Sequence, residues 1–216
     1  MDLFNDLITQ HTESPTEIIK DVFLLKGFAL ADEQMILTDL AAIISQAPLR
    51  HMVTKMGFKL SAAMTNCGAL GWVSSRKGYG YNQQDPETGL PWPIMPASFK
   101  QLAQLAAAQA GFHHFVPDAC LINQYKVGAS MGLHQDKDEL DFSQPIVSVS
   151  LGIPTVFQFG GSTRSDKSIN IPLNHGDIVV WGATARLKYH GIMPLRPNNH
   201  VTLGAYRFNL TFRKAA

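Results

Sequence analysis

Cysteine is scarce in this sequence, which also lacks a long apolar run and a signal-like start. Its two cysteines, Cys67 and Cys120, are too far apart for a CxxC motif, and we expect both to be reduced, buried thiols without a chemical role. No stretch approaches the roughly 18 apolar residues of a membrane span. The start MDLFNDLITQ has neither the basic nor the apolar part of a secretory signal. We therefore expect a cytoplasmic protein without a membrane partner.

Acidic residues are missing from one long segment, although the net charge of the chain is only +1. None occurs between Asp39 and Asp85. The basic residues of this segment are Arg50, Lys55, Lys59, Arg76 and Lys77, and its aromatic residues include Phe58, Trp72, Tyr79 and Tyr81. Cations that follow phosphates and rings that stack on bases are typical of a groove for single-stranded nucleic acid. A solvated loop region with a few core aromatics is the alternative.

The pattern of apolar residues predicts a single α+β domain over 1–216, in which about 1–20 form a poorly defined arm. A strand is expected at 21–28, and apolar residues at helical spacing predict helices over about 32–46 and 97–110. The basic, aromatic stretch between these helices, about 47–92, is expected to form an inserted lid. From about 115 to 214 we expect a jelly-roll core. Its short β-rich runs are 119–125, 145–152, 155–161, 168–173, 176–182 and 206–213.

The last of these runs alternates strictly. One face carries Tyr206, Phe208, Leu210 and Phe212, and the other carries Arg207, Asn209, Thr211 and Arg213. Such alternation usually separates a core face from a solvent face. Two arginines with an amide between them could equally hold an anionic ligand inside a barrel. Run 119–125 has a similar face with Leu121, Asn123 and Tyr125.

A histidine and an aspartate two residues apart, His134 and Asp136, would project to the same side of an extended chain and could bind one cation. The third ligand could be His175 or His190, both beside expected strands. Two histidines and one carboxylate leave open positions on the metal, the arrangement of non-haem Fe(II) oxygenases. Zinc hydrolysis is the rival chemistry.

The order of the motifs favours iron. An HxD pair, a later histidine and two arginines follow one another within the β-rich half. A co-substrate such as 2-oxoglutarate fits this set, because its keto acid end chelates a metal while its distal carboxylate pairs with a guanidinium group.

At this point the sequence resembles the AlkB-type Fe(II)/2-oxoglutarate dioxygenases, which repair alkylated nucleobases. The resemblance covers about 45–213, and the combination of HxD with RxNxTFR is highly specific. The matching stretches are MTNCGALGW (64–72), RKGYGY (76–81), PDACLINQY (117–125), GLHQDKDE (132–139), PIVSVSLGIP (145–154), FQFGG (157–161), HGDIVVWG (175–182), YHGI (189–192) and RFNLTFR (207–213).

The resemblance implies a role for each matched position. The implied iron ligands are His134, Asp136 and His190, which leaves His175 as an ordinary turn residue. The implied 2-oxoglutarate pocket consists of Arg207 and Arg213 at the two carboxylates, with Asn123, Tyr125 and Asn209 as hydrogen-bonding partners. The implied substrate contacts are Trp72, Tyr79 and Tyr81 in the lid, Met64 on the pocket wall, Asp138 at the base edge, and Arg164 at the pocket or a phosphate.

The implied reaction hydroxylates an N-alkyl group on a base and releases it, as formaldehyde in the case of a methyl group. The reaction uses Fe(II) as cofactor, consumes O2 and 2-oxoglutarate, and forms succinate and CO2. 1-Methyladenine and 3-methylcytosine in single-stranded DNA are the expected substrates, with double-stranded DNA and RNA as alternatives, and a monomer is expected. Two rival functions remain at this stage: an oxygenase of this fold that acts on protein or small molecules, and a nucleic-acid or β-barrel binding module without turnover.

Overall fold

The computed structural model describes residues 14–216, so the first thirteen residues of the expected arm lie outside it. The helices are α2 (Glu33–Gln46) and α3 (Ala97–Gln109), with 3-10 turns at Leu30–Asp32 and Ala183–Ala185. The strands are β1 (Thr16–Ile19), β2 (Val22–Leu25), β3 (Ala63–Gly68), β4 (Gly71–Ser75), β5 (Gly78–Asn82), β6 (Ala119–Lys126), β7 (Met131–His134), β8 (Ile146–Gly152), β9 (Thr155–Phe159), β10 (Ile169–Leu173), β11 (Ile178–Trp181), β12 (His190–Ile192) and β13 (Tyr206–Arg213).

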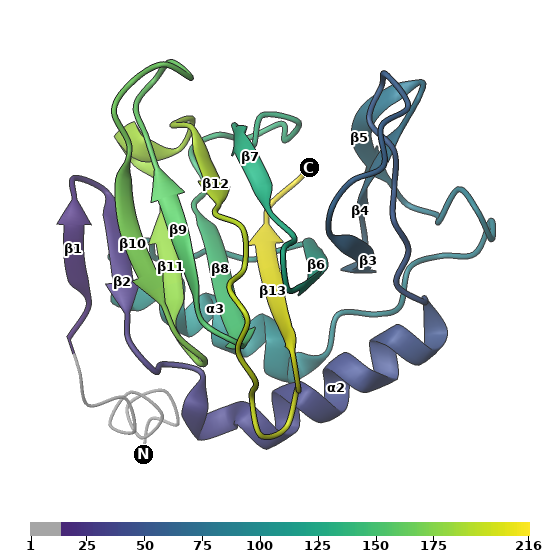
Figure 1. Cartoon of the computed structure of the whole chain (residues 1–216), viewed down its shortest axis with the longest axis horizontal. Helices are drawn as coiled ribbons and strands as arrows, with labels where there is room; N and C mark the ends of the chain where they lie inside the picture. Colours follow the sequence, from purple (N-terminus) through teal and green to yellow (C-terminus); the bar gives the residue numbers. More distant parts are fainter. Residues whose placement is uncertain (1–13) are drawn as a thin grey trace.

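These strands form two facing sheets and a separate hairpin (Figure 1). The large sheet has the order β1-β2-β11-β8-β13-β6-β3, and the small sheet has the order β10-β9-β12-β7. Neighbouring strands in both sheets run antiparallel. The expected α+β fold with a jelly-roll, or double-stranded β-helix, core is confirmed.

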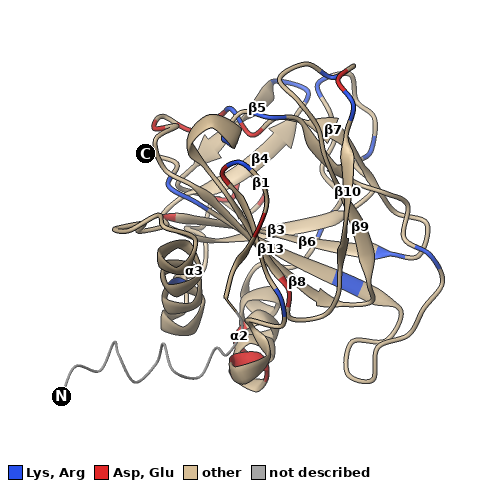
Figure 2. Ribbon diagram, turned by 90° about the vertical axis from the view of Figure 1, so that its left-hand side faces the viewer, with Lys and Arg blue, Asp and Glu red and all other residues tan. Residues whose placement is uncertain are grey.

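Two apolar layers hold the fold together. One lies between the helices and the large sheet, where Leu40 of α2 and Phe99 of α3 pack with Phe212. The other lies between the two sheets and includes Trp181 and Phe157. Figure 2 shows both helices on one side of the large sheet and β9 and β10 on the other. The large sheet is therefore covered on both faces, by the helices on one and by the small sheet on the other.

The helices begin and end close to the expected residues. Helix α2 stops at Gln46, and Ala47 is extended, with φ −130° and ψ 91°. Pro48 follows, and the residue before a proline disfavours helical backbone. Helix α3 begins directly after Pro96. No helix within 14–216 is long and apolar enough to cross a membrane.

The polar face of β13 lies in the interior of the protein, the less common of the two arrangements that its alternation allows. Phe208, Leu210 and Phe212 belong to the layer under the helices. Arg207 and Arg213, on the opposite face, are also buried, at 1% and 6% exposure. The polar face of β13 is therefore directed into the interior between the sheets, and the solvent-face interpretation is wrong.

The range 47–92, expected as a lid, contributes both to the core and to the separate hairpin. Strand β3 lies at the edge of the large sheet beside β6. Gly68 ends β3 at φ +118°, where a Cβ would lie 2.4 Å from the carbonyl oxygen of Asp118, so a glycine is required at this reversal. Strands β4 and β5 then form the two-stranded hairpin. The side-chain amide of Asn66 fixes the hairpin by bonding both the N–H and the carbonyl of Trp72.

Candidate active site

Two neighbouring strands of the small sheet bring His134 and His190 together. His134 is the last residue of β7 and His190 is the first of β12, and the two are paired in register. Gly191 of β12 allows the backbone of β7 to lie close to it, because a Cβ at Gly191 would lie 2.6 Å from the carbonyl oxygen of Met131. The two imidazole centroids are 4.5 Å apart.

Asp136 completes the group from the loop after β7. Its Oδ1 atom lies 3.6 Å from Nε2 of His134 and 3.8 Å from Nε2 of His190. One oxygen and two nitrogens thus converge on a common point. These three residues can bind a metal ion through one atom each.

Backbone carbonyls fix the tautomer of both imidazoles, that is, which ring nitrogen carries the proton. Nδ1 of His134 lies 2.9 Å from the carbonyl oxygen of Gly132, and Nδ1 of His190 lies 3.1 Å from that of Lys188. Because a carbonyl only accepts hydrogen bonds, each Nδ1 carries the proton and donates it. In the neutral ring Nε2 then has a free lone pair, the state in which histidine binds metals.

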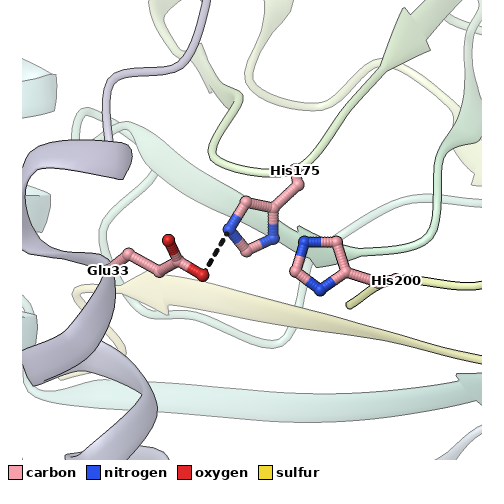
Figure 3. Close-up of side chains that lie close together, drawn as sticks. All are labelled: Glu33, His175 and His200. Atoms are coloured by element: carbon pink, nitrogen blue, oxygen red, sulfur yellow. Dashed lines mark ion pairs between the residues drawn. The ribbon is translucent and has the colours of Figure 1, made fainter. Parts of the chain in front are cut away.

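A second cluster of similar composition fails this test. Glu33, His175 and His200 lie together where the start of α2 meets the turn before β11 (Figure 3). Here Nδ1 of His175 accepts the backbone N–H of Gly152 at 2.8 Å, and Nδ1 of His200 accepts two backbone N–H groups at 3.3 Å. In the neutral rings Nε2 therefore carries the proton and offers no lone pair. The structure thus gives His175 a place in this cluster and no place beside His134.

Arg213 controls the charge of Asp136. Its Nε and Nη2 groups donate to Oδ2 of Asp136 at 2.9 and 2.6 Å. Burial raises the pKa of Asp136, but Arg213 first, then His190 and His134, outweigh burial and hold that pKa well below its usual range. Asp136 is therefore an anion, with Oδ1 free to face a metal. Burial, followed by the nearby His134, lowers the pKa of His190 to about 3, which keeps its ring neutral.

The three residues open into a cavity of about 480 Å³ between the sheets and the hairpin. Twelve of the fourteen expected site residues line it: Met64, Trp72, Tyr79, Asn123, Tyr125, His134, Asp136, Asp138, Arg164, His190, Asn209 and Arg213. Tyr81 and Arg207 are not part of its lining. The cavity therefore brings together residues from both sheets, the loop after β7 and the hairpin.

Arg207 lies deeper, with its guanidinium 5.2 Å from the ring centroid of Tyr125. Its Nη2 donates to Oγ of Ser150 at 3.0 Å. Its Nε and Nη1, and Oδ1 of Asn123, are buried without a hydrogen-bond partner among the described residues. Burial lowers the pKa of Arg207 to about 10, so the group remains charged at neutral pH. A buried cation with two unused donors fits a carboxylate.

Comparison with known proteins decides which chemistry this arrangement serves. A family model described as the 2OG-Fe(II) oxygenase superfamily matches residues 21–213. The alpha-ketoglutarate-dependent dioxygenase AlkB of Salmonella typhimurium is 52% identical over 218 residues, which cover 100% of this chain and 98% of that protein. The chain belongs to the AlkB family of 2OG-Fe(II) oxygenases.

Two further comparisons agree with this membership. The AlkB protein of Escherichia coli is 53% identical over 192 residues, which cover 89% of each chain. The structure of OsALKBH1 is 27% identical, has a TM-score of 0.80, and covers 93% of this chain and 99% of that one. The expected family, enzyme class and cofactors, Fe(II) with 2-oxoglutarate and O2, are thus confirmed, and zinc hydrolysis is set aside.

The donor set fits these AlkB-family cofactors. Two imidazoles, each with its Nε2 atom directed to the same point, and a carboxylate form the facial arrangement that Fe(II) oxygenases use. The unused donors of Arg207 fit one carboxylate of 2-oxoglutarate. Arg213, expected to hold the other carboxylate, instead donates to Asp136 with two of its nitrogens. Its part in binding 2-oxoglutarate stays a prediction.

The aromatic residues of the hairpin differ in their placement. Trp72 and Tyr79 stack with centroids 5.9 Å apart and an interplanar angle of 8°. Nε1 of Trp72 donates to Oδ2 of Asp138 at 2.8 Å, so the carboxylate expected at the base edge contacts the hairpin. Tyr81 instead donates its hydroxyl to Glu139 at 2.6 Å. Arg164 lies 5.4 Å over the ring of Tyr189 at the cavity.

Two buried charged residues beside the site, Glu139 and Arg186, were not predicted from the sequence. They pair at 3.0 Å, and their side chains are 2% and 3% exposed. Glu139 has a signal in the sequence, because it ends the matching stretch GLHQDKDE. Arg186 follows a 3-10 turn whose sequence, ATA, has no feature that marks it as functional.

Proposed function

We propose that this protein oxidatively removes N-alkyl groups from nucleobases, with 1-methyladenine and 3-methylcytosine as its substrates. The observation that carries the proposal is the cavity itself, which has the His134, Asp136 and His190 group on its wall and the stacked Trp72–Tyr79 pair in its lining. The AlkB relatives at 52% and 53% identity, and more distant relatives named as nucleic acid dioxygenases, support it.

In this proposal the chain's own residues bind and orient two ligands. When bound, Fe(II) with O2 and 2-oxoglutarate supplies the oxidation of the alkyl carbon. His134, Asp136 and His190 hold the metal, and Arg213 keeps Asp136 charged and oriented. Arg207, with Asn123 and Tyr125, receives a carboxylate of 2-oxoglutarate in the dry interior between the sheets.

The hairpin side of the cavity suits a flat, cationic base. Methylation at N1 of adenine or N3 of cytosine leaves the base positively charged at neutral pH. The faces of Trp72 and Tyr79 attract such a cation through cation–π interactions, and the negative carboxylate of Asp138 also attracts it. N1 of adenine and N3 of cytosine lie on the Watson–Crick edge of the base, so the base must leave the helix stack to reach the site. This step costs the least free energy in a single strand. We therefore propose single-stranded DNA as the preferred substrate, and RNA as the alternative.

Basic side chains at the cavity, which lie beside the acidic Asp138 and Glu139, can contact phosphates and support a nucleic-acid substrate over a protein or small molecule. Lys and Arg residues, with some acidic ones, lie on the loops around β5 and β7 (Figure 2). Arg164 and Lys137 line the cavity itself. The expected monomeric state and cytoplasmic location stay predictions.

The test is reconstitution with Fe(II) without oxygen, followed by addition of O2, 2-oxoglutarate and a methylated oligonucleotide. Succinate and formaldehyde should form in equal amounts with 1-methyladenine or 3-methylcytosine in the strand. An unmethylated oligonucleotide is the control. Succinate without formaldehyde on every methylated strand would reject the proposed substrate but leave the dioxygenase class intact.

A further inference from the structure

Two consecutive acidic residues connect the metal-binding loop to the hairpin. Asp138 accepts from Trp72 on β4, and Glu139 accepts from Tyr81 on β5. Each strand of the hairpin thus has one hydrogen bond to the segment that begins at Asp136. The first bond is exposed, whereas the second is partly buried.

Glu139 is the buried centre of this connection, because two hydrogen bonds and one ion pair from three parts of the chain converge on its carboxylate. The hydroxyl of Tyr81 lies 2.6 Å from Oε1, Nη2 of Arg186 lies 3.0 Å from Oε2, and Nε of Arg213 lies 3.5 Å from Oε1. The whole of Glu139, backbone included, is 5% exposed. A carboxylate this deeply buried depends on its partners, so loss of one donor shifts the others.

The two arginines continue from Glu139 to Asp136. Arg213 donates to the carboxylate of Asp136 at 2.6 and 2.9 Å. Arg186 donates its Nη1 to the backbone carbonyl of Asp136 at 2.8 Å. The side chain and the backbone of Asp136 are thus both held by residues that also hold Glu139. An unbroken chain of polar contacts runs from the Tyr81 hydroxyl to the metal-facing carboxylate.

We propose that Glu139 is a positioning residue that couples the hairpin to the metal site. A nucleotide bound against the hairpin stabilises the bond from the Tyr81 hydroxyl to Glu139, and through Arg213 and Arg186 it stabilises the metal-binding orientation of Asp136. Substrate binding and metal binding therefore strengthen each other. The part that concerns the nucleotide rests on the proposed function, whereas the link from Tyr81 to Asp136 does not.

The link is tested first without nucleic acid, by titrating the metal-free protein with Mn(II) and following free Mn(II) by electron paramagnetic resonance. Tyr81→Phe removes one hydroxyl and keeps the ring, and Glu139→Gln removes the charge and keeps the shape. Both should weaken Mn(II) binding, by about 2- to 30-fold, the range for changes within a coupled network. Tyr206→Phe is the matched control, because Tyr206 is exposed on β13 and does not line the cavity, and the Mn(II) affinity of this variant should match that of the wild type.

The coupling is tested by repeating the titration with a 1-methyladenine oligonucleotide. The oligonucleotide should raise the Mn(II) affinity of the wild type, and the increase should shrink in Tyr81→Phe but persist in Tyr206→Phe. A merely structural role for Glu139 would lower the affinity equally with and without the oligonucleotide.

Two results would overturn the inference. The first is wild-type Mn(II) affinity in Tyr81→Phe and Glu139→Gln, and the second is an oligonucleotide that binds the wild type without changing its Mn(II) affinity. If no methylated oligonucleotide binds the wild type, the proposed function fails, and the first titration still decides the link. Thermal unfolding of the metal-free variants shows whether each is folded. If Glu139→Gln is unfolded, the titration of Tyr81→Phe decides the link on its own.

Discussion

Arg207→Lys tests the 2-oxoglutarate pocket most directly, because it keeps the positive charge and changes only the donor geometry. Arg207 is 1% exposed, and two of its nitrogens have no partner within residues 14–216. A guanidinium group presents these donors in a fixed plane that matches a carboxylate, whereas an ammonium group is a point charge. We therefore expect Arg207→Lys to bind 2-oxoglutarate more weakly at unchanged net charge.

The size of the effect follows from the number of donors lost. A hydrogen bond to a charged group contributes about 1.5–3 kcal/mol. If lysine replaces a two-bond contact by a single bond, the loss of one bond raises the 2-oxoglutarate concentration needed for half-maximal rate by about 10- to 150-fold. The substitution also removes the bond from Nη2 to Ser150, so that contribution needs its own control.

The assay measures initial succinate formation against 2-oxoglutarate concentration, with a fixed methylated oligonucleotide. Ser150→Ala is the matched control, because it removes the described partner of Arg207 and keeps the guanidinium. Its effect should be clearly smaller. The same 2-oxoglutarate dependence in Arg207→Lys and the wild type would refute the assignment of Arg207 to a carboxylate.

Four other predictions test separate parts of the site. His190→Ala should abolish both Mn(II) binding and turnover while the protein stays folded; a variant that keeps both would contradict its assignment as a ligand. Trp72→Ala should weaken binding of a methylated oligonucleotide by about 1–3 kcal/mol in a fluorescence titration, and wild-type affinity would return Trp72 to a structural role. Asp138→Asn keeps an acceptor for Trp72 but loses the charge, so activity should fall more on 1-methyladenine and 3-methylcytosine than on neutral 1-methylguanine and 3-methylthymine; equal losses would argue against a role for that charge. Burial, followed by His200, lowers the pKa of His175, so the unfolded chain binds more protons than the folded one below the ordinary histidine pKa of about 6.5. The free energy of unfolding should therefore decrease as the pH falls through this range, and urea titrations should show a flatter pH dependence for His175→Gln.

Elements with a strong apolar pattern could be predicted from the sequence. Both helices and the six short β-rich runs of the second half occur where they were expected, because each has an apolar pattern that the fold satisfies by burial. The strand expected at 21–28 is shorter in the structure, where β2 spans Val22–Leu25. Strands β7 and β12 could not be predicted in this way. Their four and three residues, MGLH and HGI, are too short for alternation to show, and only their pairing makes them strands.

The candidate site shows a similar division. The HxD spacing and the later histidine indicated three residues that the structure brings within reach of one metal ion, and the family resemblance chose among the alternatives. The roles of the two arginines stay predictions. The sequence could not show that Arg213 contacts Asp136, because the two are 77 residues apart and meet only through the sheets. Nor could it separate the two His/acid clusters, whose difference lies in whether Nδ1 faces a backbone carbonyl or a backbone N–H.

The position of His134 on β7 has a consequence for dynamics. Within residues 14–216, β7 is the edge strand of the small sheet and pairs with β12 alone, while His190 lies on β12, an inner strand. A metal ion held by both histidines would act as a cross-link between an edge strand and its neighbour. Amide protons of β7 should therefore exchange with solvent rapidly in the metal-free protein and slow down when Mn(II) binds, whereas those of β8 and β13, at the centre of the large sheet, should change little.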